Sequence, residues 1–205
     1  MNSNALIGLT GIYCAGKNYV ARLLEARGFP VLDVDKLGHE VLEAEKAAVM
    51  ARFGPDILDA GGAVDRRLLG NRVFGKPEAL NALEDIVHPA ANRLTEAWIA
   101  RQNGPCVINA ALLHRSSVFK RLDFIILVRA PFLARLLRAR RRDRLPLSQL
   151  IRRFKSQQEF ISQYLIRKAD IDTIDNPGYC GFCSSLYRRM LENRLDAILS
   201  RRGTR

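Results

Sequence analysis

The segment covering residues 5–27 constrains the fold of this chain more than any other. Residues 5–10 (Ala-Leu-Ile-Gly-Leu-Thr) form a short apolar run that predicts a buried strand. Apolar residues at helical spacing predict a helix over 18–27. Between them, residues 11–17 match G-x-x-x-x-G-K. This order of strand, glycine loop and helix predicts an α/β fold with the loop at the carboxyl end of a strand.

The loop has the composition of a phosphate-binding site. In such a loop, successive backbone N–H groups converge on phosphate oxygens, and the following helix adds its positive N-terminal dipole. Lys17 is expected to reach the β- and γ-phosphates. The alternative interpretation is a glycine-rich turn with an exposed lysine. The expected nucleotide-binding residues of the loop are Gly11, Ile12, Tyr13, Cys14, Ala15, Gly16, Lys17 and Asn18.

Asn18 departs from the motif, which calls for Ser or Thr after the lysine because that hydroxyl ligates Mg²⁺. An amide carbonyl oxygen can still coordinate Mg²⁺ or hold a water on it. We therefore expect Asn18 to be a weaker magnesium ligand.

The rest of the chain alternates between strand and helix patterns, which favours a parallel, three-layer α/β sheet. Residues 124–128 are a continuous apolar run, typical of a strand covered on both faces. Pro131 fits the first turn of the next helix. That helix is expected to be arginine-rich from Arg135 to Arg144. Further strands are expected at 29–32, 106–108 and 171–174, with a turn at 175–178. Other helices are expected at 147–167, at 184–200 and over most of 36–101, with breaks near 54–55, 61–62 and 76–77.

The formal charge of +12 is concentrated in the second part of the chain. Residues 1–128 hold 15 basic and 14 acidic residues, whereas residues 129–205 hold 18 basic and 7 acidic ones. This asymmetry predicts an anionic partner, which could be nucleic acid, an acidic surface or a phosphate-rich small molecule. We do not expect nucleic acid, because no nucleic-acid motif is present and few aromatic residues accompany the arginines.

No membrane partner is expected, because no apolar run reaches the roughly 18 residues that span a bilayer. The N-terminus lacks the charged region of a signal peptide, so a cytoplasmic location is expected. Cys180 and Cys183 have CxxC spacing without a second ligand pair, and we expect an incidental loop pair rather than a metal or redox site. The sequence does not indicate the oligomeric state.

Four further segments carry a resemblance to a known family. They are Asp33–Val41 with its D-x-D, Phe53–Leu58, Val64–Phe74 and Leu83–Pro89 with its His-Pro pair. In this order the chain resembles the dephospho-CoA kinases from Leu6 to about Leu199. The resemblance implies a single phosphate-loop nucleoside/nucleotide kinase domain. Its core would cover about 1–35, 104–134 and 169–205, with a helical acceptor-binding insertion at about 36–103 and an arginine-rich lid at about 135–168.

The resemblance also implies a reaction. ATP would phosphorylate the ribose 3′-hydroxyl of dephospho-CoA to give coenzyme A, with Mg²⁺ bridging the phosphates. Asp35 would then be catalytic, accepting the hydroxyl proton and orienting the nucleophile. Asp33 would support Asp35 or contact metal-bound water. His88 would line the acceptor side, unless it is a helix-capping or packed histidine.

The arginine-rich segment gains a role from the same resemblance. Arg138 and Arg142 match the spacing of lid arginines, which grip phosphate oxygens bidentately and are counted with Lys17 and Asp35 as catalytic. Asp175 and Asn176 would lie against the adenine. The other arginines around 135–153 exceed what a lid needs. Most of them are expected to form a solvated helix face.

The chain departs from the family at both positions expected to organise magnesium. Asn109 replaces an acid after the third core strand, and Asn18 replaces the loop hydroxyl. Two alternatives therefore stay open, namely a catalytically impaired homologue that binds nucleotide or CoA, and another nucleoside or nucleotide kinase of this fold. Because Lys17, Asp35 and both lid arginines remain, we expect an active kinase.

Overall fold

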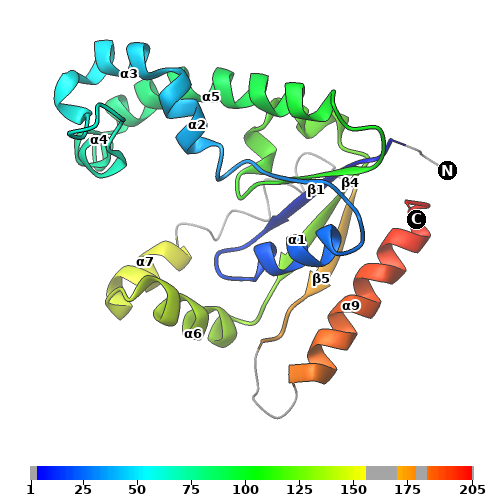
Figure 1. The fold of residues 1–205 in the computed structure, drawn as a ribbon. Coiled ribbons are helices and arrows are strands. Elements are labelled where there is room, and N and C mark those ends of the chain that lie inside the picture. The colour runs from blue at the N-terminus through cyan, green and yellow to red at the C-terminus, as the bar shows by residue number, and fades with distance from the viewer. Residues whose placement is uncertain (1–3, 156–169, 179–183, 205) are drawn as a thin grey trace. The chain divides into compact units, whose positions relative to one another are not determined.

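The computed structural model describes residues 4–155, 170–178 and 184–204. It divides into two compact units (Figure 1). One comprises Met1–Leu32 with Gln102–Arg205, and the other comprises Asp33–Arg101. The second unit covers nearly the same stretch as the insertion expected at about 36–103. Each unit has its own core and is described by itself. No helix among the described residues is long and apolar enough to cross a membrane.

The first unit is built on a five-stranded sheet in the order β2-β3-β1-β4-β5. Its pairs β1–β3, β1–β4 and β4–β5 are parallel, which confirms the predicted α/β class. All six residues of β1 are buried, because a central parallel strand is covered on both faces. The strands are β1 Leu6–Gly11, β2 Val31–Asp33, β3 Cys106–Asn109, β4 Phe124–Arg129 and β5 Ile171–Asp175. Asp175, expected in a turn, is the last residue of β5.

Two helices, α1 (Lys17–Glu25) and α9 (Ser184–Arg201), cover one face of this sheet (Figure 1). Their buried apolar side chains share one core with the strands. On the other face, a Cβ at Gly8 would lie 2.6 Å from Leu113 Cδ2, so glycine permits this close approach. The turns Leu113–Arg115 and Ser117–Arg121 follow here, and each contributes a fully buried residue.

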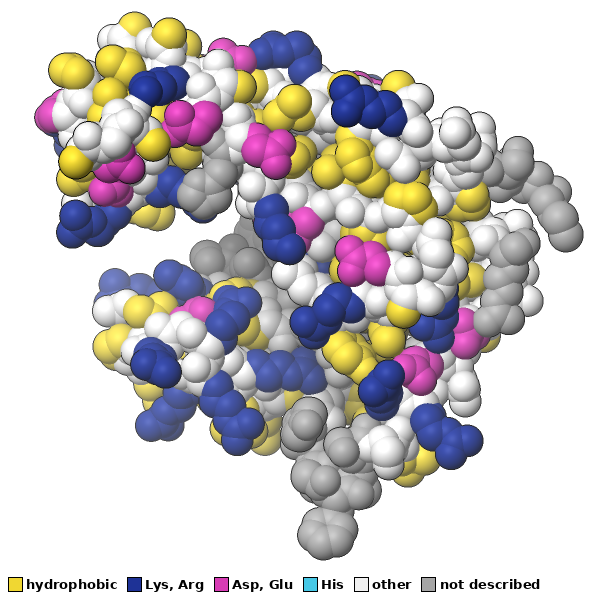
Figure 2. Space-filling view, in the orientation of Figure 1, with side chains coloured by type: hydrophobic (Ala, Val, Ile, Leu, Met, Phe, Trp, Pro, Cys, Tyr) yellow, Lys and Arg dark blue, Asp and Glu magenta, His cyan; other side chains and the backbone are white. Residues whose placement is uncertain are grey.

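The arginine-rich stretch forms α6 (Phe132–Asp143) and α7 (Leu147–Lys155). Dark blue basic side chains gather over these helices in Figure 2. Their small core contains Ala139, Leu150 and Phe154. Pro131 was expected in the first turn of this helix. It is instead the N-cap residue of α6, because its ψ of 148° is not helical. The end predicted for α7, near residue 167, lies outside the described residues.

The second unit is helical, as its sequence pattern predicts. The breaks expected near 54–55, 61–62 and 76–77 all fall between its helices. The side chain of Asp65 caps α4 by accepting hydrogen bonds from the N–H groups of Arg67 and Leu68 at 2.7 and 3.1 Å. The elements are α2 Gly38–Ala44, α3 Lys46–Phe53, a 3-10 helix Pro55–Ile57, α4 Arg66–Val73 and α5 Pro77–Ile99.

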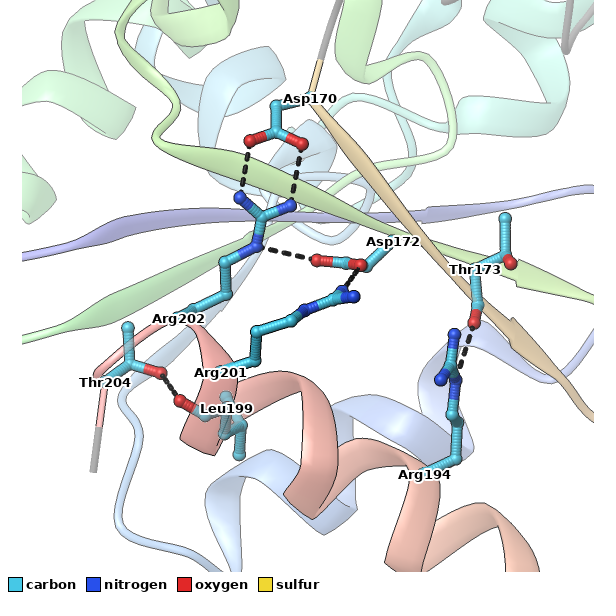
Figure 3. Close-up of polar contacts among 8 residues, drawn as sticks. All are labelled: Asp170, Asp172, Thr173, Arg194, Leu199, Arg201, Arg202 and Thr204. Carbon is cyan, nitrogen blue, oxygen red and sulfur yellow. Dashed lines mark hydrogen bonds and ion pairs between the residues drawn. The ribbon is translucent and has the colours of Figure 1, made fainter.

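An ion-pair cluster ties the end of α9 to the start of β5 (Figure 3). Arg202 donates to both carboxylate oxygens of Asp170, at 2.5 and 2.6 Å, and through Nε to Asp172 at 2.8 Å. Arg201 also donates to Asp172, whose side chain is only 6% exposed. The Arg202 guanidinium lowers the pKa of Asp170 below its ordinary value of 3.8. Two arginines therefore compensate a carboxylate that would be costly to bury alone.

We predict that Arg202→Gln lowers the free energy of unfolding by about 1–2 kcal/mol at pH 7, since charge-assisted hydrogen bonds are lost. Because the pKa of Asp170 is lowered in the folded chain, its contribution is complete above about pH 5 and is lost as the pH falls through that pKa. The difference from wild type should therefore shrink between pH 7 and pH 3. Urea denaturation at both pH values measures it.

Arg194→Gln is the matched control. Arg194 lies on α9 and donates to a neutral acceptor, the Thr173 carbonyl, at 3.4 Å. Its effect should not depend on pH over this range. An equal effect of Arg202→Gln at pH 7 and pH 3 would contradict the ion-pair interpretation.

Candidate functional site

The loop of residues 12–16 joins β1 to α1, and both glycines of its motif have steric reasons to be there. Gly11 ends β1 beside Val128, and a Cβ at Gly11 would lie 2.8 Å from the Val128 carbonyl oxygen. Gly16 caps α1 with φ +96°, a left-handed conformation that favours glycine. Between them, the Ala15 N–H donates to the Ile12 carbonyl at 2.9 Å and closes a tight turn.

Cys14 has a backbone conformation in this loop that glycine would adopt equally well. Its φ of +60° is left-handed, which is uncommon for a residue with a side chain. Burial raises the pKa of its thiol from the ordinary value of 9.0. The thiol is therefore neutral near pH 7 and is no nucleophile there.

The outer side of the loop is held by two side chains from other elements. Arg138 of α6 donates through Nη1 to the carbonyls of Cys14 and Ala15, at 3.2 and 3.0 Å. Asn176, directly after β5, donates through Nδ2 to the Ala15 carbonyl at 2.9 Å. Arg138 also donates through Nη2 to the Asn176 carbonyl and Oδ1 at 3.3 and 3.1 Å. Three segments of the chain thus meet at the loop carbonyls.

This arrangement fixes where the loop amides point. In a trans peptide, the carbonyl of one residue and the N–H of the next point in opposite directions. With the Ala15 carbonyl facing Arg138, the N–H of Gly16 faces away from it. At the start of any helix the first N–H groups lack a carbonyl one turn earlier in the helix, and α1 has no acidic residue in its first turn. Lys17 begins α1 and adds its charge, so this face of the loop suits an anion.

A cavity of about 520 Å³ opens beside the same loop. Its size and aromatic side chains suit a nucleoside next to the phosphate-binding loop. The residues that line it include Gly16, Tyr19, Asn176, Ser185, Tyr187 and Leu191. Asn176 thus lines this cavity, whereas its neighbour Asp175 does not. Asp175 instead accepts hydrogen bonds from Arg129 at 3.0 Å.

Asn18 and Asn109 lie together in the first unit. Asn109 ends β3 and is buried, and its Nδ2 donates to Asn18 Oδ1 at 3.4 Å. Asn109 Oδ1 is also buried, and within the described part of the chain it has no hydrogen-bond partner. A buried oxygen of this kind fits a magnesium ion or its bound water, since Mg²⁺ accepts neutral oxygen ligands. Two carboxamides without a carboxylate are weak ligands for Mg²⁺. Most of the affinity for the ion would therefore come from the substrate phosphates.

Arg142 does not point freely into solvent. Its Nε and Nη2 donate to the two carboxylate oxygens of Asp143, at 2.7 and 3.2 Å, and its guanidinium lies 5.1 Å from the centre of the Tyr13 ring. This carboxylate raises the pKa of Arg142. Arg138 and Arg142 therefore both contact the loop, one through its carbonyls and the other through a side chain.

The remaining predicted residues belong to the helical unit. Asp33 begins that unit and pairs with Lys36 at 3.6 Å. Asp35 is exposed in the turn before α2. His88 lies inside α5, 3.9 Å from Glu84, with 45% of its side chain exposed, so it is neither a helix cap nor packed in a core.

Several residues of the site were not predicted from the sequence, among them the cavity residues Tyr19, Ser185, Tyr187 and Leu191, and Asp143. Tyr187, which lines the cavity, lies on α9 among apolar, polar and charged residues, and no pattern distinguishes it. Asp143 did carry a signal: it is the single acidic residue among nine basic ones in the stretch 135–155. Cys180 and Cys183 lie outside the described residues. Among the described residues, no group of three or more His, Cys, Asp or Glu side chains could hold a metal ion.

We predict that Gly16→Ala weakens nucleotide binding at least tenfold. The new Cβ would require a strained φ and would collide with Asn176 Nδ2, which holds the loop. Gly28→Ala is the control: Gly28 has φ +84°, and no described atom lies within 4 Å of its Cβ position. Calorimetric titration with ATP should show the loss in Gly16→Ala alone. Equal affinities in the two variants would contradict the assignment of this loop.

Known proteins resemble this chain along most of its length. The family model for dephospho-CoA kinase matches residues 5–178. A dephospho-CoA kinase of Treponema pallidum (strain Nichols) is 33% identical over 209 residues, covering 97% of this chain and 95% of the relative. A crystal structure of a Thermus thermophilus protein matches with a TM-score of 0.77 and 32% identity, covering 97% of this chain and 98% of that one.

A dephospho-CoA kinase structure from Campylobacter jejuni matches at a TM-score of 0.63, covering 98% of both chains. At 24% identity this likeness shows the fold alone. The family model covers most of the sequence, and the treponemal relative matches along nearly its whole length. This chain therefore belongs to the dephospho-CoA kinase family.

Proposed function

We propose that this chain transfers the γ-phosphoryl group of ATP to the ribose 3′-hydroxyl of dephospho-CoA, giving coenzyme A and ADP. The observation that carries the proposal is the loop of residues 11–17, where Arg138 and Asn176 hold the Ala15 carbonyl and the Gly16 N–H of the same peptide faces the opposite side. Membership of the dephospho-CoA kinase family supplies the acceptor. ATP is the nucleotide substrate, and the cavity beside Asn176 suits its nucleoside.

Phosphoryl transfer depends on positioning and on compensating charge, since the transition state spreads negative charge over the transferred group. We assign the phosphates to Lys17 and the amides at the start of α1. Arg138 and Arg142 come from the same helix, α6, and remain charged at any physiological pH. The Arg142 guanidinium, beside the Tyr13 ring of the loop, would offset the charge that develops on the γ-phosphoryl oxygens. Arg138 donates to carbonyls on the outer side of the loop and would keep the loop in its binding conformation.

The acceptor side is assigned from the family resemblance. The 3′-oxygen forms the new bond to the γ-phosphorus, the bond to the β–γ bridging oxygen breaks, and the hydroxyl proton passes to the Asp35 carboxylate. Asp33 would support Asp35, and His88 would contact the acceptor. Supporting this assignment, Asp35 is exposed and lies in the turn between β2, which ends at Asp33, and α2.

Magnesium is also part of the proposal. When bound, Mg²⁺ would supply charge compensation on the phosphates. Asn18 and Asn109 are the residues of this chain that would hold it, the buried Asn109 oxygen being the supporting observation. The cytoplasmic location expected from the sequence stays a prediction.

We predict that the chain consumes dephospho-CoA in an ATP-dependent reaction. A coupled assay that detects the released ADP measures it. Lys17→Met should lower kcat/KM at least a hundredfold, because it removes the charge that reaches the β- and γ-phosphates. Lys120→Met, which removes a lysine far from the loop in sequence and outside the assigned site, should change it less than twofold. ATP binding without turnover, with either Mg²⁺ or Mn²⁺ at high enzyme concentration, would favour the binding-only homologue instead.

We predict that Asn109→Asp combined with Asn18→Ser lowers the Mg²⁺ concentration for half-maximal activity about tenfold, because a carboxylate and a hydroxyl replace two neutral amides. Titration of the ATP complex with Mg²⁺ by calorimetry checks the affinity separately from turnover. Weaker binding of Mg²⁺ by the double variant would mean that the site is adapted to the two amides.

A further inference from the structure

The carboxylate of Asp143 lies at a junction between the phosphate loop and two helices. It accepts hydrogen bonds from three side chains, which come from three segments. Tyr13 donates its hydroxyl from the loop, and Arg142 donates through Nε and Nη2 at 2.7 and 3.2 Å from α6. Arg153 donates through Nη1 at 3.4 Å from α7. The family resemblance gives Asp143 no role, so these contacts need a separate explanation.

The local electrostatics keep this carboxylate charged. Asp143 is 14% exposed, whereas the side chains of Arg142 and Arg153 are 60% and 55% exposed. The hydrogen bond from Arg142 is the main cause that lowers the pKa of Asp143. Asp143 therefore stays ionised across the physiological pH range. Because it is the more buried partner, it is the fixed point to which the more exposed side chains of Arg142 and Arg153 bind.

Aromatic contacts hold the same junction from the other side. The Tyr13 ring lies under the Arg142 guanidinium and makes an edge contact with Phe154, at 5.3 Å between ring centres. The Arg135 guanidinium covers the Phe154 ring at 4.9 Å. The side chain of Tyr13 thus packs against the small core of α6 and α7. A change in the conformation of the loop would therefore alter the packing of these two helices.

We propose that Asp143 is a positioning residue that fixes Arg142 over the phosphate loop and, through Tyr13, ties α6 and α7 to that loop. This proposal rests on the proposed kinase function. Asp143 occupies Nε and Nη2 of Arg142, which leaves the Nη1 hydrogens for a phosphate oxygen. A guanidinium held on one edge by a carboxylate and on one face by a ring loses less freedom when it binds the transition state.

The test is the kinetics of Asp143→Asn, which keeps the shape and removes the charge. We expect kcat to fall about tenfold with little change in the KM for ATP, because Arg142 acts on the transition state. In an Arg142→Gln background, the same substitution should change kcat less than twofold, since Asp143 acts through Arg142. Asp143→Glu should restore part of the loss. Equal losses in both backgrounds would overturn the proposal.

Two further variants separate the parts of the junction. Tyr13→Phe keeps the ring and removes the hydroxyl, and it should lower kcat by about threefold. Arg140→Gln removes an exposed charge from the same helix and should leave kcat within twofold of wild type. A loss in Arg140→Gln as large as that in Asp143→Asn would show a general charge effect and would overturn the proposal.

A readout without turnover keeps this proposal distinct from the kinase assignment. Asp143→Asn should speed amide hydrogen exchange over residues 132–155 with a non-hydrolysable ATP analogue bound, and Arg140→Gln should not. If wild type fails to phosphorylate dephospho-CoA while this exchange difference is present, the proposed function fails and the junction stands. Unchanged exchange in Asp143→Asn would overturn the junction whatever the activity.

Discussion

The neighbouring positions of β1, β4 and β5 are the constraint on which the rest of the site depends. The parallel register places the end of β1 beside the end of β4, and the Asn176 N–H, directly after β5, donates to the Arg129 carbonyl at 2.7 Å. Asn176 therefore reaches the loop that follows β1. With Arg138 it binds the Ala15 carbonyl of that loop, and the Gly16 N–H of the same peptide faces the opposite side. A different strand order would leave these carbonyls without such partners.

The basic second part of the chain serves several different purposes. Arg201 and Arg202 neutralise carboxylates at the start of β5, and Arg129 pairs with Asp175. On α6, Arg138 binds loop carbonyls and Arg142 binds Asp143. These ion pairs and hydrogen bonds within the protein account for part of the positive charge. Arg140, Arg141 and Arg144 remain on the exposed surface, which agrees with the solvated face expected for most of the surplus.

Sequence patterns predicted the elements of this fold well, because buried parallel strands and amphipathic helices leave clear periodicities. The five strands, the helix after the first strand and the helical character of residues 36–101 were all expected near their observed positions. Individual contacts were less accessible. The family resemblance implied a phosphate-binding role for Arg138 and Arg142. It gave no indication of their bonds to the Cys14 carbonyl and to Asp143, because such bonds depend on how α6 packs against the loop. Tyr187 carried no local signal, since a cavity forms only when distant segments meet.

The most direct test of the central claim is the position of the transferred phosphate. After incubation of the chain with ATP and dephospho-CoA, ³¹P and ¹H NMR should show a new phosphomonoester coupled to the ribose 3′ proton, together with ADP. That result would establish that the loop, its arginines and the acceptor side act in one reaction. A spectrum that shows only inorganic phosphate and ADP, or a monoester at another position, would contradict it.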